Sequence, residues 1–214
     1  MTSEVPETAR RSRTRERLLD AAYEVFADVG VHTASVEQIS EAAGFTRGAF
    51  YSNFSSKEEL FFALMEREND ARITTLVQQM GHSLPKVADG PLTAETLAVV
   101  ILDFLQGPFN DNRRWCVVQS EFELLALRDA AIAPQYRDFR AGFDASLVQI
   151  VDDALRQVQR EFALEPTTAV RLLIASYDDA VKQSILEGDS DPGALERLRS
   201  TLTAVVLAIS RSTD

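Results

Sequence analysis

The sequence predicts an all-α protein in which a small N-terminal domain of three helices precedes a larger C-terminal helical domain. Apolar residues recur at intervals of three and four over most of the 214 residues. No stretch alternates apolar and polar side chains over the length of a useful strand. Breaks rich in glycine and proline separate the periodic stretches and end the expected helices.

The clearest local signals describe two short helices joined by a tight turn. Ser35 is a helix N-cap, and Gln38, three places later, completes a capping box. Gly44 ends this helix, because glycine readily adopts the left-handed conformation that closes helices. Thr46 then caps a second helix, expected over residues 47–54. Two helices joined in this way are typical of a helix-turn-helix, which reads DNA.

The outer face of the second helix is slim and polar. Such a helix enters a major groove of roughly 12 Å width, where guanidinium, hydroxyl and amide groups reach phosphates and base edges. Lys57 stands in the first turn of the next helix, where the helix dipole disfavours a cation, so it indicates a phosphate partner. The alternative is a helical hairpin with ordinary caps, in which Tyr51 and Lys57 are only solvated.

The stretch GFTRGAFYSNFSSKEEL resembles the signature G-x-[ST]-x-G-x-[LF]-Y-x-[HN]-F-x-[ST]-K-x-x-L of the TetR family of transcriptional regulators (TetR/AcrR-like). The resemblance extends upstream through LLDAAYEVFADVGVHTASVEQIS and covers about residues 14–65. Asn53 departs from the histidine that is commoner at its place. The resemblance implies that the DNA-binding residues are Ser35, Thr46, Arg47, Gly48, Ala49, Tyr51, Ser52, Asn53 and Lys57. Of these, Arg47, Gly48, Ala49 and Ser52 would lie nearest the bases.

Basic residues gather ahead of this unit. Residues 10–17, RRSRTRER, carry a net charge of +4. Because the whole chain carries −11, the other residues together carry −15. We expect residues 1–13 to form a flexible basic arm that contacts DNA through Arg11 and Arg13, since such an arm clamps phosphates or enters a minor groove. The alternative is a solvated tail without a specific role.

Three domains are expected: the arm over 1–13, the helix-turn-helix over 14–60, and an effector-binding and dimerisation domain over 61–214. A long helix follows the helix-turn-helix and breaks within residues 81–92. The remaining helices are expected over residues 93–106, 110–128, 132–163, 166–187 and 192–211.

Aromatic and polar residues of the middle helices are candidates for an effector pocket, because ligand cavities are mostly apolar with a few orienting polar groups. The alternative is a core rich in phenylalanine. The candidates are Phe104, Phe109, Trp115, Gln119, Phe122, Glu123, Tyr136, Phe139, Phe143 and Tyr177.

The last two helices carry apolar stripes wider than one core face requires, which favours a homodimer with a four-helix interface. The alternative is packing of both stripes inside one subunit. The candidate interface residues are Val170, Leu173, Tyr177, Val181, Leu198, Leu202, Val205 and Ile209.

Several classes of protein are disfavoured. The single Cys116 cannot form an internal disulfide, and the two histidines are too far apart in sequence for a compact zinc site, so neither a metal nor a cofactor is expected. No apolar run reaches the roughly 18 residues of a membrane helix, and the N-terminus does not resemble a secretory signal, which predicts a cytoplasmic protein. No nucleophile with an adjacent base supports an enzyme.

The sequence therefore predicts a ligand-responsive regulator of transcription, which acts as a repressor on a pseudo-palindromic DNA operator and is released by a small hydrophobic effector. An activator without small-molecule induction and a helical protein-binding module are the alternatives. The operator, the effector and the regulated genes are not readable from the sequence.

Overall fold

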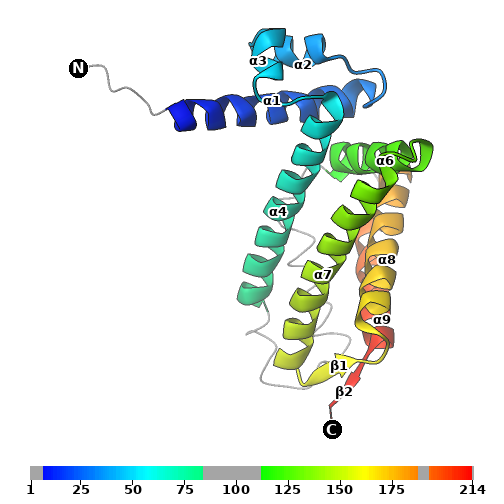
Figure 1. Cartoon of the computed structure of the whole chain (residues 1–214). Coiled ribbons are helices and arrows are strands. Elements are labelled where there is room, and N and C mark those ends of the chain that lie inside the picture. Colours follow the sequence, from blue (N-terminus) through cyan, green and yellow to red (C-terminus); the bar gives the residue numbers. More distant parts are fainter. Residues whose placement is uncertain (1–6, 84–111, 188–192, 214) are drawn as a thin grey trace. The chain divides into compact units, whose positions relative to one another are not determined.

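The computed structural model describes residues 7–83, 112–187 and 193–213, and over these residues the predicted all-α class is confirmed (Figure 1). The chain forms two compact units. The N-terminal unit is Met1–Asn69 with Val117–Ile132, and the C-terminal unit is Asp70–Cys116 with Ala133–Asp214. The division falls inside α4 (Lys57–Ser83) and α6 (Asn112–Arg128), so part of α6 belongs to the N-terminal unit. The predicted division instead assigns all residues after residue 60 to the C-terminal domain.

The N-terminal unit begins with α1 (Glu7–Val29), α2 (Val36–Ala42) and α3 (Arg47–Tyr51). Residues 7–13, expected in a flexible arm, are helical in the structure. The turns after α1 and α2 rest on Gly30 and Gly44, whose φ angles of 79° and 71° are left-handed and favour glycine. The predicted helix 47–54 is shorter than expected, because Ser52 is already the C-cap of α3.

A chain of aromatic rings forms the core of this unit. Phe26 contacts Phe61 at 5.0 Å between ring centroids, and Phe61 contacts Phe122 at the same distance. Phe62 contacts Phe122 at 4.8 Å, and all three pairs meet edge to face, which is a favoured aromatic geometry. The segment of α6 around Phe122 is thus held to α4 by buried rings, and Phe61 of α4 in turn packs against Phe26 of α1.

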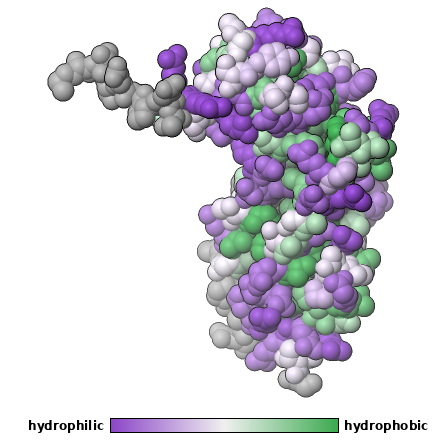
Figure 2. Space-filling model, viewed as in Figure 1, coloured by the Kyte–Doolittle hydropathy of each residue, from purple (hydrophilic) through white to green (hydrophobic). Residues whose placement is uncertain are grey.

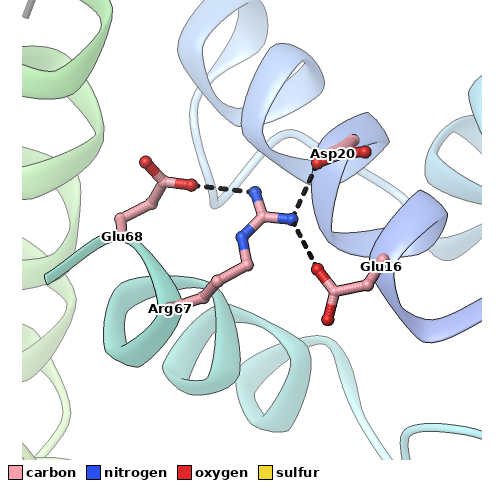
Figure 3. A network of polar contacts seen from close by, with 4 residues as sticks. All are labelled: Glu16, Asp20, Arg67 and Glu68. Atoms are coloured by element: carbon pink, nitrogen blue, oxygen red, sulfur yellow. Dashed lines mark hydrogen bonds and ion pairs between the residues drawn. The ribbon is translucent and has the colours of Figure 1, made fainter. Parts of the chain in front are cut away.

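Arg67 adds a polar connection between α4 and α1 (Figure 3). Its guanidinium donates to Asp20 at 2.7 Å and to Glu16 at 3.3 Å, both on α1, and to its neighbour Glu68 at 2.8 Å. Burial alone would lower the pKa of Arg67, but the hydrogen bonds that Arg67 donates to the carboxylates of Glu68 and Asp20 outweigh burial and raise it. The first turns of α4 are therefore fastened to α1 by both rings and ion pairs.

The C-terminal unit includes α7 (Ala133–Gln157), α8 (Pro166–Glu187) and α9 (Ala194–Ile209). The predicted helix 93–106 lies outside the described residues. The predicted helices 110–128, 166–187 and 192–211 correspond to α6, α8 and α9, but helix 132–163 is predicted too long, because α7 ends at Gln157.

Two short strands follow where only helix was expected. β1 (Arg160–Phe162) pairs antiparallel with β2 (Ser210–Ser212), so the chain after α7 lies beside the chain after α9. Gln159 has a left-handed φ of 56°, which is incompatible with continuing α7. Arg160 then donates to the hydroxyl of Ser210 at 2.9 Å and to its carbonyl at 2.7 Å. These contacts between residues far apart in sequence explain why local patterns did not predict the strands.

Candidate DNA-binding site

Side-chain caps define the ends of α2 and α3. The Ser35 hydroxyl accepts from the Gln38 backbone amide at 3.1 Å, and the side-chain oxygen of Gln38 accepts from the Ser35 backbone amide at 2.8 Å. The Thr46 hydroxyl accepts from the Ala49 amide at 3.3 Å. Both predicted caps are therefore present, and the Ser35 and Thr46 hydroxyls bind the first turns of their own helices.

The outer face of α3 is open and polar. Arg47, Gly48, Tyr51 and Ser52 are exposed, while Ala49 is half-buried. A Cβ added to Gly48 would meet only the Thr46 hydroxyl, at 3.7 Å, so the backbone at this point is uncovered. Behind this face lies Phe50, which is fully buried and packs against Phe54 at 5.9 Å between ring centroids.

Arg47 is held by two neighbours on this face. Its guanidinium donates to the Glu37 carboxylate at 2.6 Å and to the Tyr51 hydroxyl at 3.5 Å. Its Cζ atom lies 5.4 Å from the centre of the Tyr51 ring. The hydrogen bond to Tyr51 and the charge of Glu37 raise the pKa of Arg47. Sequence reasoning missed Glu37. The signal that could have found it is its position as an acidic residue on the exposed side of α2.

Asn53 turns towards its own helix. Its side-chain amide donates to the Ala49 carbonyl at 2.8 Å, and its side-chain oxygen is buried and has no hydrogen-bond partner within the described ranges. The Ser52 hydroxyl likewise donates to its own helix, to the Gly48 carbonyl at 2.9 Å, so DNA contacts by both side chains stay predictions.

Lys57 binds the turn between α1 and α2. Its ammonium donates to the carbonyls of Val31 at 2.6 Å, Ala34 at 2.8 Å and His32 at 3.4 Å. The Glu121 carboxylate of α6 accepts from the Val31 amide at 3.2 Å. The peptide groups on both sides of Val31 are thus held by opposite charges from α4 and α6. A phosphate contact by Lys57 stays a prediction, and such a contact would compete with these carbonyls.

Three arginines of α1 donate to carbonyls at the C-terminal ends of α2 and α3. Arg11 donates to the Ser52 carbonyl at 3.4 Å, Arg15 to the Asn53 carbonyl at 3.2 Å, and Arg17 to the Ala43 carbonyl at 2.7 Å. The Cζ atom of Arg15 lies 4.1 Å from the centre of the Phe54 ring, and that of Arg17 lies 4.5 Å from the centre of the Phe45 ring. Arg11 of the expected arm, and Arg15 and Arg17 just after it, therefore bind protein backbone.

The predicted effector residues fall into three groups. Phe104 and Phe109 lie outside the described residues. Gln119, Phe122 and Glu123 belong to the N-terminal unit, where Phe122 is buried in the ring core and Glu123 is exposed. The C-terminal unit contains the half-buried Trp115, Tyr136, Phe139, Phe143 and Tyr177. The Phe122 ring packs against Phe61 and Phe62 in the N-terminal unit, and its role in an effector pocket stays a prediction.

Arg72 of α4, which sequence reasoning missed, lies over the Trp115 ring and acts electrostatically on Tyr177. Its Cζ atom lies 4.2 Å from the centre of the Trp115 ring. Burial raises the pKa of the Tyr177 hydroxyl, the positive charge of Arg72 opposes this rise, and Asp178 adds to it. The Gln79 side-chain oxygen, also on α4, is buried and has no hydrogen-bond partner among the described residues. The C-terminal unit therefore combines apolar rings with buried polar groups.

The predicted dimer stripe is largely covered within one chain. Val170, Leu198, Leu202 and Ile209 are buried at α8 and α9. Leu173, Tyr177 and Val181 of α8 are partly buried against the cluster of Leu198 and Leu202. Val205 is half-buried. On the same α8, Leu172 and Leu186 are 47% and 85% exposed.

In the space-filling view, hydrophobic side chains reach the visible surface in patches separated by hydrophilic ones (Figure 2). No helix in the described part of the chain is long and apolar enough to cross a membrane. Across residues 7–83, 112–187 and 193–213, no three His, Cys, Asp or Glu side chains gather to hold a metal ion.

Comparisons with known proteins agree with this geometry. The family model described as bacterial regulatory proteins, tetR family, matches residues 18–64. HTH-type transcriptional activator FasR of Mycolicibacterium smegmatis is 33% identical over 96 residues, which cover 45% of this chain and 42% of FasR. HTH-type transcriptional repressor Rv1474c of Mycobacterium tuberculosis is 26% identical over 201 residues, 92% of this chain and 94% of that protein. A TetR transcription regulator from Haloarcula marismortui has the same fold, with a TM-score of 0.65 at 18% identity over 94% of this chain and all of its own.

Proposed function

Because this chain belongs to the TetR family of bacterial regulatory proteins, we propose that it is a repressor that binds a pseudo-palindromic operator as a dimer and is released by a small effector. The observation that carries the proposal is the capped, slim and exposed face of α3, backed by the buried Phe50 and Phe54. A rigid helix with an uncovered outer face fits a major groove. The name of the similar Rv1474c supports repression, and the protein works in the cytoplasm, where its DNA partner lies.

The effector is bound in the C-terminal unit, around Arg72, Trp115 and Tyr177. Rings supply apolar contact, and buried polar groups orient a ligand. The guanidinium beside Trp115 and the phenol of Tyr177 favour a flat hydrophobic molecule that carries a hydrogen-bonding or anionic group. The positions of Phe104 and Phe109 in the chain leave them as further candidates.

The proposed coupling uses α4, which contributes Lys57 and Arg67 to the N-terminal unit and Arg72 to the C-terminal unit. A shift of α4 on effector binding alters the spacing of the two recognition helices of the dimer, which must match one DNA turn of roughly 34 Å. Linkage then requires that effector and DNA weaken one another by the same factor, typically about 5- to 150-fold.

Fluorescence anisotropy with fragments from upstream of the gene, at several salt concentrations, tests DNA binding. The wild type is expected to select one fragment, and Tyr51→Ala is expected to lose it, since Tyr51 is 47% exposed on α3. Thermal unfolding checks that the variant stays folded, because the Tyr51 ring also contacts the buried Phe50 ring. Glu66→Gln, an exposed change on α4, is the matched control. Weak and equal binding of every fragment by the wild type would refute the proposal.

Two further measurements separate the alternatives. Light scattering after size exclusion is expected to give twice the chain mass of 23.7 kDa, and a clean monomer would exclude the dimer. A reporter gene behind the selected fragment is expected to be expressed more strongly without the protein. Weaker expression without it would favour the activator, a role that the name of FasR gives to another relative.

A further inference from the structure

We infer that Glu37 is a specificity-determining residue, which holds the guanidinium of Arg47 in one orientation and thereby restricts the bases that Arg47 accepts. The inference rests on the proposed function, because it needs a protein that reads DNA. The residues that carry it are Glu37 of α2 and Arg47 and Tyr51 of α3, which lie together on the exposed face.

The ion pair between Glu37 and Arg47 has little to do with folding. Their side chains are 57% and 63% exposed, and exposed pairs contribute little to stability because water screens them. The pair nevertheless fixes geometry, since Glu37 receives one end of the guanidinium at 2.6 Å and Tyr51 lies at the other end, at 3.5 Å. A long side chain that would otherwise sample many rotamers is thus given a direction.

This direction matters for base reading. A guanidinium has five N–H donors in a plane, so it can donate to a carboxylate and still present two donors to the O6 and N7 acceptors of a guanine. Held by Glu37, Arg47 meets a base edge in one plane only, and a base in another position is left without its contact. Without Glu37, Arg47 is free to turn to nearby phosphates, which are accepted in any sequence.

The carboxylate also acts against unselective binding. Close to a DNA backbone, Glu37 is repelled by phosphates, and this cost is the same for every sequence. This repulsion is offset only at a site where Arg47 donates to the base that it accepts. Glu37 therefore lowers affinity for random DNA more than affinity for the operator.

The chain offers a matched control for charge alone. Glu41 is also exposed on α2, one turn further on, and its side chain makes no hydrogen bond or ion pair among the described residues. Glu41→Gln removes the same charge from the same short helix but leaves Arg47 held.

The test is a double-mutant cycle with wild type, Glu37→Gln, Arg47→Ala and the double variant, and with Glu41→Gln beside them. Affinities for the selected operator, for operators changed at single base pairs and for random DNA are measured by anisotropy at several salt concentrations. Thermal unfolding of each variant confirms folding, which these exposed changes are expected to leave intact.

Glu37→Gln is expected to lower the ratio of operator to random affinity by about tenfold, a loss of the order of one base contact, and to relax preference at one base pair. In the Arg47→Ala background, the same change is expected to have no effect on that preference. Equal effects of Glu37→Gln and Glu41→Gln, or an unchanged effect without Arg47, would overturn the inference and leave the proposed function intact. Absence of sequence-specific binding by the wild type would instead refute both.

Discussion

The two units differ in how completely one chain buries its large side chains. Of those that are almost completely buried in the described part of the chain, all but Val170 belong to the N-terminal unit. The aromatic residues of α7 are only half-buried, and Leu186 of α8 is 85% exposed. Both units expose single apolar side chains, such as Leu127 and Leu186, so the units differ in their cores. The DNA-reading unit is shaped by large side chains that its own core buries, whereas the C-terminal unit buries few of its large side chains as completely.

The largest expected effect tests whether the ring core shapes the N-terminal unit. Phe122→Ala removes a ring that is 1% exposed and contacts Phe61 and Phe62, so it is expected to lower the free energy of unfolding by about 3–5 kcal/mol. Urea denaturation measures the change. The control is Leu127→Ala on the same helix, which is 77% exposed and is expected to stay within about 0.5 kcal/mol of wild type.

Removal of the Lys57 ammonium comes second. Lys57→Met leaves three carbonyls of the turn after α1 without their donor, and is expected to cost about 1.5–3 kcal/mol of stability. Hydrogen exchange at residues 31–34 is expected to speed up. Operator affinity falls as well, because the turn positions α2.

The salt dependence of that loss separates two roles of Lys57. A phosphate contact contributes a slope of about −0.9 to the dependence of log affinity on log salt. If Lys57 acts by holding the turn, the slope of Lys57→Met matches that of wild type. A slope smaller by about one contact would show that Lys57 leaves its carbonyls to bind phosphate.

Glu121 is expected to have a smaller effect on the same turn. Glu121→Gln weakens one hydrogen bond, to the Val31 amide, and is expected to cost about 1 kcal/mol in urea denaturation. Glu123→Gln serves as control, since Glu123 is exposed on the same helix. An equal loss in both variants would mean that the charge of α6 matters and the contact with Val31 does not.

The smallest effect belongs to the C-terminal unit and depends on pH. The amide of Thr167 and the hydroxyl and amide of Thr168 lower the pKa of Glu165 from 4.5 to about 2, because they donate to its carboxylate at the start of α8. A lowered pKa means that the stabilisation is complete above pH 4.5 and is lost as the pH falls towards 2.

Thermal unfolding of wild type and Glu165→Gln across this range tests the cap. The difference in melting temperature is expected to be constant above pH 4.5 and to vanish near pH 2. A difference that persists at low pH would show that the carboxylate charge is not the stabilising feature.

Local signals predicted the parts of the fold that depend on neighbours in sequence. The caps at Ser35 and Thr46 and the bounds of α8 are as predicted, because a cap needs only residues three places away. The role of Lys57 was not predictable, since its carbonyl partners are 23 to 26 residues earlier in the chain. The burial of Phe122 likewise depends on which helix packs against α6, and an apolar pattern in the sequence does not predict the packing partner.

The arginines of α1 finally bear on how this protein tolerates change. Arg15 and Arg17 each donate to a carbonyl while their flat guanidinium faces lie over an aromatic ring, and a lysine reproduces neither feature well. Arg10 and Arg13 are exposed, and lysine would keep their charge. In a saturation scan that selects for function, we therefore expect lysine to be accepted at Arg10 and Arg13 and selected against at Arg15 and Arg17. Residues of one basic cluster would then differ in the substitutions that they tolerate.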